Sequence, residues 1–238
     1  PSIMYKTILL FQVFEPTEVP VEESQSIFNV IKETNLLGLG IYVVLFTLAI
    51  IAVYIFVSRY SAIKKAGQID ENFMYKIRSN VQSGNIQGAR SLCQASDSPV
   101  ARMVEKGIQR IGKPLRDIDA AIENVGNLEV FRLEKNLSTL ASIAGAAPMI
   151  GFFGTVTGMI LAFYEMSTEQ AVSPGLLAGG IYQALITTAI GLAIGIMAFV
   201  GYNILVANVE KVVFTMERST VEFMDLLQEP SAYKLTPG

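Results

Sequence analysis

Three long stretches of this chain carry no charged side chain, and they constrain its fold more than any other feature. The three windows are Leu36–Ser58, Asn136–Tyr164 and Gln170–Val209. Each is longer than the roughly 20 apolar residues that a helix needs to cross the hydrocarbon core of a bilayer. Because a charge at the centre of a membrane helix costs about 2.5–3.5 kcal/mol, these windows predict three spanning helices rather than buried helices of a soluble domain.

The composition agrees with membrane insertion and excludes several kinds of site. Hydrophobic residues make up 51% of the chain and charged residues only 16%, which is unusual for a soluble domain. The chain has no histidine and a single cysteine, Cys93, so an intrachain disulfide and a histidine or multi-cysteine metal site are excluded. We expect Cys93 to be a small buried residue rather than a reactive thiol. We also expect no cofactor and no bound metal.

The charges between the windows predict how the chain is oriented. Residues 59–135 hold thirteen basic and nine acidic side chains, whereas residues 1–35 hold two basic and five acidic ones. Since lysine and arginine accumulate on the cytoplasmic side of membrane proteins, residues 59–135 are predicted to be cytoplasmic, with the N-terminus periplasmic and the C-terminus cytoplasmic. The predicted organisation is an outside-facing segment 1–35, a first span 36–58, a cytoplasmic helical domain 59–135, a second span 136–164, a short periplasmic loop 165–173, a third span 174–208, and a cytoplasmic helical extension and tail 209–238.

The cytoplasmic segment has the pattern of a helical bundle. Apolar residues recur at helical spacing from Leu115 onward, with no breaker between that run and the second window. Ser83-Gly84-Asn85 predicts a turn between two shorter helices, Ser98-Pro99 begins another helix, and Gly112-Lys113-Pro114 ends it.

The third span is predicted to begin at Ser173-Pro174 and to outrun the bilayer. The stretch from Pro174 to Val209 would be about 54 Å long as one helix, well beyond a hydrocarbon core of ~30 Å. The apolar positions that continue it into the cytoplasm are Val209, Val212, Met216, Phe223 and Leu227. The predicted fold is therefore an all-α integral membrane protein with three transmembrane helices. Two of these are long helices that extend into a cytoplasmic helical bundle, and several copies are expected to associate.

Small and hydroxyl residues form one stripe on each of the two later spans. The stripe on the second span is Ala147, Gly151, Thr155, Gly158 and Ala162, and the stripe on the third is Ala184, Thr188, Gly191, Gly195 and Ala198. One interpretation is close helix packing, because small residues let two backbones approach. The other is that the two stripes face a shared interior, where small side chains leave room for water or for a helix of another protein.

No acidic or basic side chain lies in any of the three windows. Proteins that move protons or cations usually carry such a group inside the membrane. Gln183 is polar, but an amide does not titrate. A polar lining without a carboxylate therefore suits a housing around another protein's titrating group better than a self-sufficient transporter.

Two segments of the chain resemble the MotA/TolQ/ExbB proton-channel family, and within it the ExbB/TolQ branch. They are Ala147–Val156 (APMIGFFGTV) and Gly179–Leu192 (GGIYQALITTAIGL), and the resemblance covers roughly residues 36–228. It implies an inner-membrane stator unit in which five copies surround a dimer of a single-span ExbD/TolR-like partner. That partner would supply one essential intramembrane aspartate per chain. Proton passage would drive rotation, and a TonB- or TolA-like protein would carry the work to the outer membrane.

The resemblance also implies roles for individual residues. By motif position, Thr155 and Thr188 would line the ion pathway opposite the partner's aspartate, with Thr187 and Gln183 beside them. Pro148 matches the motif proline, where a kink is expected. Well-known members of the family have glutamate at the position of Gln183, so a proton-relay role does not carry over to it. The small residues expected to complete the lining are Ala147, Gly151, Gly154, Gly158, Ala184, Gly191 and Gly195.

Two main hypotheses follow. The first is a stator and channel subunit of a motor driven by the proton-motive force, and the alternative is a non-conducting helical membrane scaffold. A membrane enzyme is a third class, but the chain has no histidine, no nucleophile–base constellation and no intramembrane acid, so we expect it not to be an enzyme. The sequence does not distinguish a Ton-like system, which serves nutrient uptake, from a Tol-like system, which serves envelope maintenance.

Overall fold

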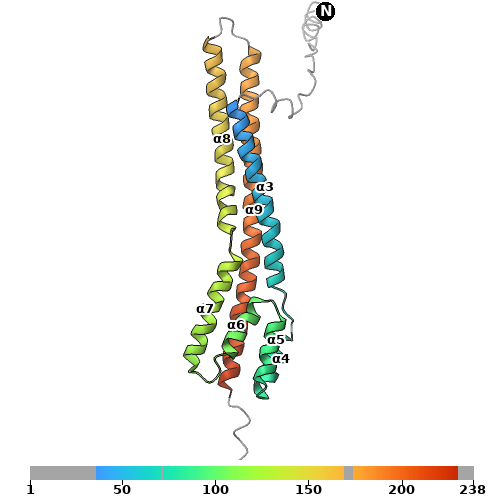
Figure 1. Ribbon diagram of the computed structural model, residues 1–238. Helices are drawn as coiled ribbons and strands as arrows, with labels where there is room; N and C mark the ends of the chain where they lie inside the picture. The colour runs from blue at the N-terminus through green and yellow to red at the C-terminus, as the bar shows by residue number, and fades with distance from the viewer. Residues whose placement is uncertain (1–35, 71, 169–173, 230–238) are drawn as a thin grey trace, which may run out of the picture.

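The computed structural model describes residues 36–70, 72–168 and 174–229, and every regular element in these ranges is an α-helix. Figure 1 shows a long narrow bundle in which the long helices run side by side and the shorter ones gather at one end. The helices are α3 (Leu36–Ala66), α4 (Phe73–Gln82), α5 (Ile86–Ala95), α6 (Pro99–Ile108), α7 (Leu115–Leu133), α8 (Leu137–Thr168) and α9 (Pro174–Gln228).

Three stretches of helix are long and apolar enough to cross a membrane. They are Gly38–Ala66 in α3, Leu115–Thr168 in α7 and α8, and Leu177–Gln228 in α9. The prediction of an all-α protein with three spans is therefore confirmed for the described residues. The predicted segment 1–35, the chain from 169 to 173 and the end of the tail from 230 lie outside the described residues.

Helix α9 is the longest element and continues far beyond any bilayer. Its 55 residues correspond to about 82 Å, so the prediction that the helix of the third span outruns a ~30 Å hydrocarbon core is confirmed. It begins at Pro174, whose fixed φ suits the first turn of a helix. The far half of α9 is covered on one face by the short helices, because Val209, Val212, Met216 and Phe223 are all buried.

The predicted continuity between the run from Leu115 and the second span is wrong. Helix α7 ends at Leu133, α8 begins at Leu137, and Asn136 between them has a φ of 64°. This left-handed backbone conformation cannot continue a right-handed helix, and asparagine tolerates it better than most residues. The break falls where the uncharged window begins, so the second span and α7 are separate helices.

The predicted turns of the short-helix region are confirmed. Gly84 (φ 75°) lies between α4 and α5, and Gly112 (φ 91°) lies between α6 and α7. Ser98 caps α6, because its hydroxyl accepts a hydrogen bond of 3.2 Å from the backbone N–H of Ala101. Cys93 is buried as expected. Burial, assisted by the negative charge of Glu105, raises the pKa of its thiol to about 12.

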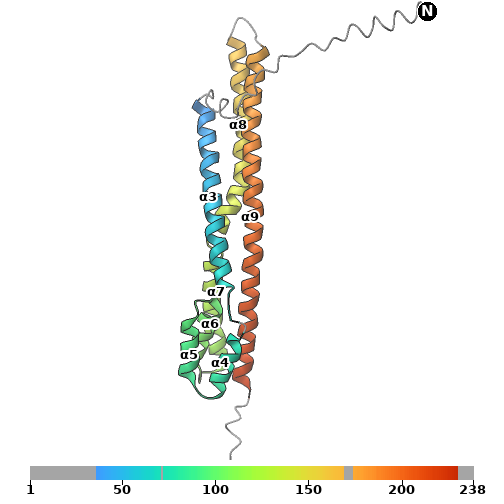
Figure 2. The same ribbon diagram turned by 90° about the vertical axis from the view of Figure 1, so that its right-hand side faces the viewer.

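Figure 2 shows the end of α3 beside the region where α6 and α7 lie. A chain of ion pairs connects the end of α3 to α6 and α7. The buried carboxylate of Glu129 accepts hydrogen bonds from Arg102 Nη2 at 2.7 Å and from Arg132 Nη1 at 2.6 Å. Arg102 Nη1 also donates to Asp97 at 2.8 Å, and Lys65 Nζ donates to Asp97 at 3.0 Å. The hydrogen bond from Lys65, together with the charge of Arg102, lowers the pKa of Asp97.

Candidate functional site: the interface of α8 and α9

The two stripes of small residues face each other across the interface of α8 and α9. The two helices run antiparallel along most of their membrane-spanning length (Figure 1), and this is the most extensive helix pair in the described chain. Gly151 lies against Gly191, and Gly158 lies against Ala184. The two stripes identified in the sequence are thus the faces through which α8 and α9 pack against each other.

Glycine is required where the two backbones touch. A Cβ atom on Gly191 would lie 2.6 Å from the carbonyl oxygen of Ala147, and one on Gly151 would lie 2.8 Å from the carbonyl oxygen of Thr187. The other stripe glycines meet side chains in the same way: Gly154 meets Thr187, Gly158 meets Ala184, and Gly195 meets Pro148. These contacts are those of close helix packing, and they leave no room for a Cβ atom between the two helices at these glycines within one chain.

Pro148 lies inside α8, which continues on both sides of it from Leu137 to Thr168. Proline has no N–H to donate to the carbonyl of Ala144, one turn earlier. Its ring packs instead where Gly195 leaves space, since a Cβ on Gly195 would lie 2.5 Å from Cγ of Pro148.

Three threonine hydroxyls form a hydrogen-bonded cluster at the centre of this interface. The hydroxyls of Thr155 and Thr188 bond directly to each other, Thr188 Oγ1 lies 3.0 Å from the carbonyl oxygen of Gly151, and Thr155 Oγ1 lies 3.1 Å from that of Ala184. Thr187 Oγ1 donates to the carbonyl oxygen of Ala184 at 2.7 Å. Because each hydroxyl has one proton and two lone pairs, Thr155 and Thr188 can exchange donor and acceptor roles without moving.

The members of this cluster differ in their access to the surface. Thr187 is buried at 3% exposure, whereas Thr155 and Thr188 are partly exposed. Gln183 lies one helical turn from Thr187 and is also partly exposed. The structure thus brings the three threonines together, and within the described residues it shows no hydrogen bond between Gln183 and any of them. Thr155 and Thr188 remain able to meet a group that approaches from outside the helix pair.

Two features of the site were not predicted. Gly180 extends the contact by one turn, because a Cβ there would lie 2.6 Å from Cβ of Ala162. Gly180 lies four residues before Ala184, and this helical spacing could have added it to the stripe on the third span. The carbonyl oxygens of Gly151 and Ala184 are the main acceptors for the threonines. Residue types do not reveal which carbonyls a neighbouring helix reaches.

The side chains of this cluster are uncharged and offer hydrogen bonding. In the ranges that the structure describes, no three histidine, cysteine or acidic residues gather in a possible metal site. The hydroxyls can donate to an ionised carboxylate and accept from a protonated one.

Comparison with known proteins identifies the family. The model of the MotA/TolQ/ExbB proton channel family matches residues 95–218, more than half of the chain. The Tol-Pal system protein TolQ of Pseudomonas aeruginosa is 32% identical over 142 residues, which cover 55% of this chain and 62% of that protein. The biopolymer transport protein ExbB of Salmonella typhimurium is 31% identical over 151 residues, which cover 56% of this chain and 62% of that protein.

A third relative, an ExbB homolog from Methanothermobacter thermautotrophicus, is 27% identical over 154 residues, which cover 65% of this chain and 52% of that protein. The chain thus spans between about half and three fifths of the length of these relatives. The family match includes both threonine-bearing helices down to Arg218. With three membrane-capable helices and relatives named ExbB and TolQ, the chain belongs to the ExbB/TolQ branch of the MotA/TolQ/ExbB proton channel family.

Proposed function

We propose that this chain is the stator and channel subunit of an inner-membrane motor driven by the proton-motive force. In this proposal, five copies surround a dimer of an ExbD/TolR-like single-span protein that supplies an intramembrane aspartate. A TonB- or TolA-like protein then transmits the work to the outer membrane. The observation that carries the proposal is the partly exposed, uncharged threonine cluster in a membrane span of a proton-channel family member.

The cluster suits a carboxylate that alternates between two protonation states. A carboxylate surrounded by lipid and protein is desolvated, which favours its neutral form. Hydroxyl donors favour the charged form, because hydrogen bonds to an ionised group are stronger than those between neutral groups. Thr155 and Thr188 would turn toward the charged carboxylate and bond each other, or the carbonyls of Gly151 and Ala184, when it is neutral.

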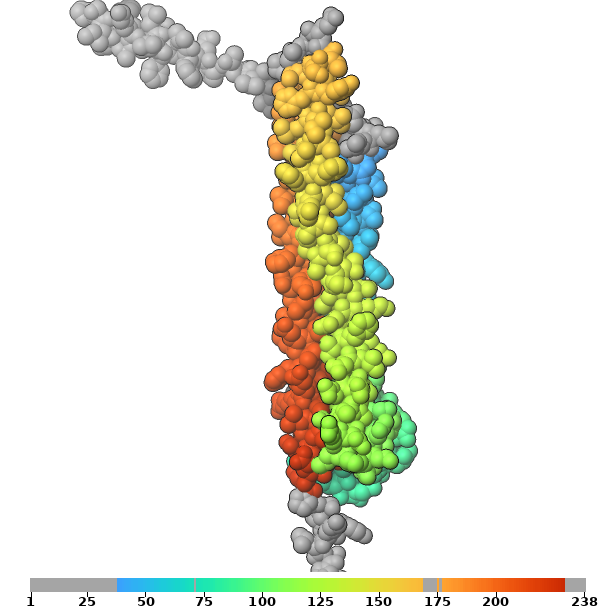
Figure 3. Space-filling model, turned by 90° about the vertical axis from the view of Figure 1, so that its left-hand side faces the viewer, coloured from blue at the N-terminus to red at the C-terminus, as the bar shows by residue number. Residues whose placement is uncertain are grey.

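The uncovered apolar surface supports association with copies and with a partner. Figure 3 shows the face formed by α7 and α8 uncovered along its length. In α8, Met149 and Phe152 are 72% and 63% exposed, close in sequence to Gly151 and Thr155. Outside the uncharged windows, Phe131 of α7 is 74% exposed and Phe214 of α9 is 66% exposed. In this proposal, lipid or the partner covers the first pair, and neighbouring copies of the chain cover the second.

The test is reconstitution with the partner. The chain would be co-expressed with a single-span, aspartate-containing protein encoded beside it, and the purified complex would be weighed by native mass spectrometry. We expect five copies of this chain with two of the partner. In proteoliposomes, a pH-sensitive dye should report proton entry only when both proteins are present and the aspartate is intact. Purification without a partner, or proton entry that is independent of the aspartate, would contradict the proposal.

The alternative function is a non-conducting scaffold. The close contacts of Gly151 and Gly191 favour it, since packing alone explains their position. A scaffold would also co-purify with partners, but its complex would admit no protons under any applied gradient.

A further inference from the structure

A groove of about 390 Å³ runs between α3 and α9 at membrane depth. Its walls are Ala52, Val53 and Phe56 of α3 and Met197, Val200 and Ile204 of α9, all within the uncharged windows. Val53 and Val200 are 48% and 50% exposed, so the groove is open to its surroundings. An open apolar groove at this depth presents a surface suited to a hydrocarbon chain.

Helices α3 and α9 run parallel beside this groove, and the residues that touch across them keep a constant difference in sequence number. A Cβ on Gly201 would lie 3.1 Å from the ring of Phe56, and one on Gly67 would lie 3.3 Å from Val212. Both pairs are 145 positions apart in the chain, since 201 − 56 and 212 − 67 both equal 145. Residues that differ by about this number therefore lie at the same depth on the two helices.

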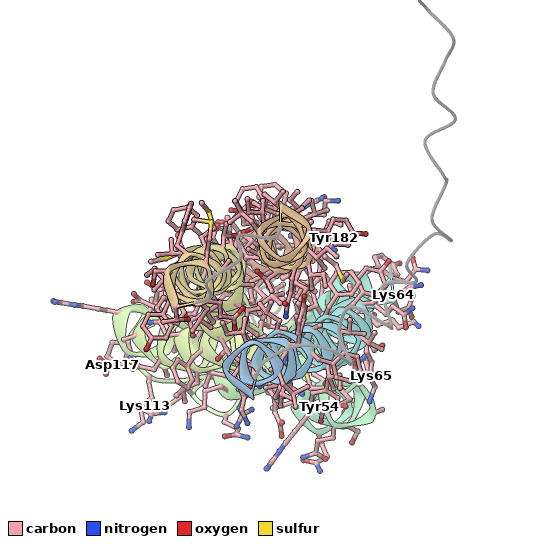
Figure 4. All side chains as sticks on the ribbon, turned by 90° about the horizontal axis from the view of Figure 1, so that it is seen from above. Tyr54, Lys64, Lys65, Lys113, Asp117 and Tyr182 are labelled. Atoms are coloured by element: carbon pink, nitrogen blue, oxygen red, sulfur yellow. The ribbon has the colours of Figure 1, made fainter. Side chains whose placement is uncertain are left out.

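On each of the two helices that form the groove, a lysine follows the wall residues just beyond the end of the uncharged window. Lys64 lies eleven residues after Val53, and Lys211 lies eleven residues after Val200. Eleven residues are about three helical turns, so each lysine lies within about 20° of its wall residue and about 16 Å farther along the helix. Figure 4 shows Lys64 on the same side of the bundle as Tyr182. Tyr182 precedes Val200 by eighteen residues, which is five full helical turns, so the two residues lie on the same face of α9. The α9 wall of the groove and Lys64 are therefore on one side of the bundle.

These two lysines are exposed and available to an anion. In the described part of the chain, neither Lys64 nor Lys211 forms an ion pair, whereas the neighbouring Lys65 is bound to Asp97. The nearest acidic residue in the sequence of α9 is Glu210, which is also exposed. Tyr60 stacks on the wall residue Phe56, with ring centroids 5.9 Å apart.

We propose that this groove binds an acyl chain of an anionic phospholipid whose phosphate is held by Lys64 and Lys211. Lysine side chains extend toward the headgroup region while their stems lie along apolar surface. Tyrosine is favoured at the same level, where Tyr60 lies. Two cations at one end of an apolar groove match the amphipathic form of such a lipid, and each adds about fivefold to the attraction of an anionic surface. The proposal requires only membrane insertion and is independent of ion conduction.

A photoreactive lipid tests the location. The full chain would be reconstituted in vesicles of phosphatidylcholine and phosphatidylglycerol that contain phosphatidylglycerol with a diazirine in its acyl chain. After illumination, mass spectrometry of the digested protein should place adducts on the groove walls around Val53 and Val200. Unlabelled phosphatidylglycerol should compete better than phosphatidylcholine. Adducts spread evenly over all exposed apolar residues of the spans would overturn the proposal.

Two matched variants test the chemistry. Lys64→Gln with Lys211→Gln should lower labelling of the groove walls to the level of other exposed apolar positions of the spans, and Val200→Phe, which fills the groove, should do the same. The control is Arg110→Gln with Lys113→Gln, which removes two exposed charges from the loop between α6 and α7 and should leave labelling unchanged. Equal labelling in the lysine variant would overturn the role of the two lysines. Cross-linking of a cysteine at position 53 to a second copy of this chain would show that protein, not lipid, covers the groove.

Discussion

Some glycines of α8 and α9 lie at close helix contacts and others face open space, and single alanine substitutions distinguish the two kinds. A Cβ on Gly191 would lie 2.6 Å from a carbonyl oxygen of α8, whereas a Cβ on Gly179 would have no neighbour within 4 Å. Gly191→Ala should therefore destabilise the chain by about 1–3 kcal/mol through overpacking. Gly179→Ala, the control in the same helix, should be neutral or stabilise by about 0.5–1 kcal/mol. Thermal unfolding in detergent measures both, and equal melting temperatures would contradict the close contact.

The single thiol gives a second prediction at this scale. Cys93 is 2% exposed, and its pKa is raised to about 12. Since the thiolate is the reactive form, maleimide should label native Cys93 very slowly at pH 8 and rapidly after unfolding. Cys93→Ser with Ser91→Cys places a thiol at an exposed position of the same helix and should be labelled rapidly in the native state. Rapid labelling of the native wild-type chain would show that α5 is not packed as described.

Among the elements, the junction of α7 and α8 differs most from the sequence-based expectation. Asn136 has a φ of 64°, which costs an ordinary L-residue about 1–2 kcal/mol. Asn136→Gly should be neutral or slightly stabilising, and Asn136→Ala should lower the unfolding free energy by about 1 kcal/mol. Equilibrium unfolding of the two variants checks this. An alanine variant as stable as the glycine variant would mean that α7 and α8 form one continuous helix.

The helices themselves were largely predictable, whereas their ends and contacts were not. Uncharged windows fixed the three spans, because hydrocarbon excludes charge regardless of the neighbours. The break at Asn136 was missed because no glycine or proline marks it. Near the end of α9, Leu226 is buried, whereas Leu227, one of the apolar positions used to predict the extension, is only partly buried. A seven-residue spacing drifts by ~20° per repeat around a straight helix, so the register is lost over several turns.

For the candidate site, the positions of the threonines on the helices were predictable from the sequence, whereas the distance between the two helices was not. Spacing alone placed Thr155 and Thr188 on stripes, and the structure pairs them. Whether the stripes enclose space or close on each other depends on the distance between two backbones. Gly151 and Gly191 favour close approach, but glycine in a stripe is equally compatible with an open lining. The role of the threonines in an ion pathway remains a proposal.

At the scale of the whole molecule, the ion pairs around Glu129 join the spans to the short helices. Glu129 is 3% exposed and bonds both Arg102 and Arg132. Glu129→Gln should lower the unfolding free energy by about 1–3 kcal/mol, because two charge-assisted hydrogen bonds are weakened. Glu123→Gln, at an exposed position of α7, is the control and should have no effect. If the two variants unfold alike in chemical denaturation, the network does not stabilise the fold.

The central claim is that the hydroxyls of Thr155 and Thr188 serve an ion pathway and do more than pack α8 on α9. The most direct measurement is proton entry into proteoliposomes that hold the chain with its partner, compared among the wild type, Thr155→Val/Thr188→Val and Thr155→Ser/Thr188→Ser. The valine variant keeps the shape but loses the hydroxyls, and the serine variant keeps the hydroxyls. We expect intact complexes for all three, with proton entry lost in the valine variant and retained in the serine variant. If the valine variant admits protons at the wild-type rate and only its melting temperature falls, the two threonines serve helix packing alone, which would contradict their role in an ion pathway.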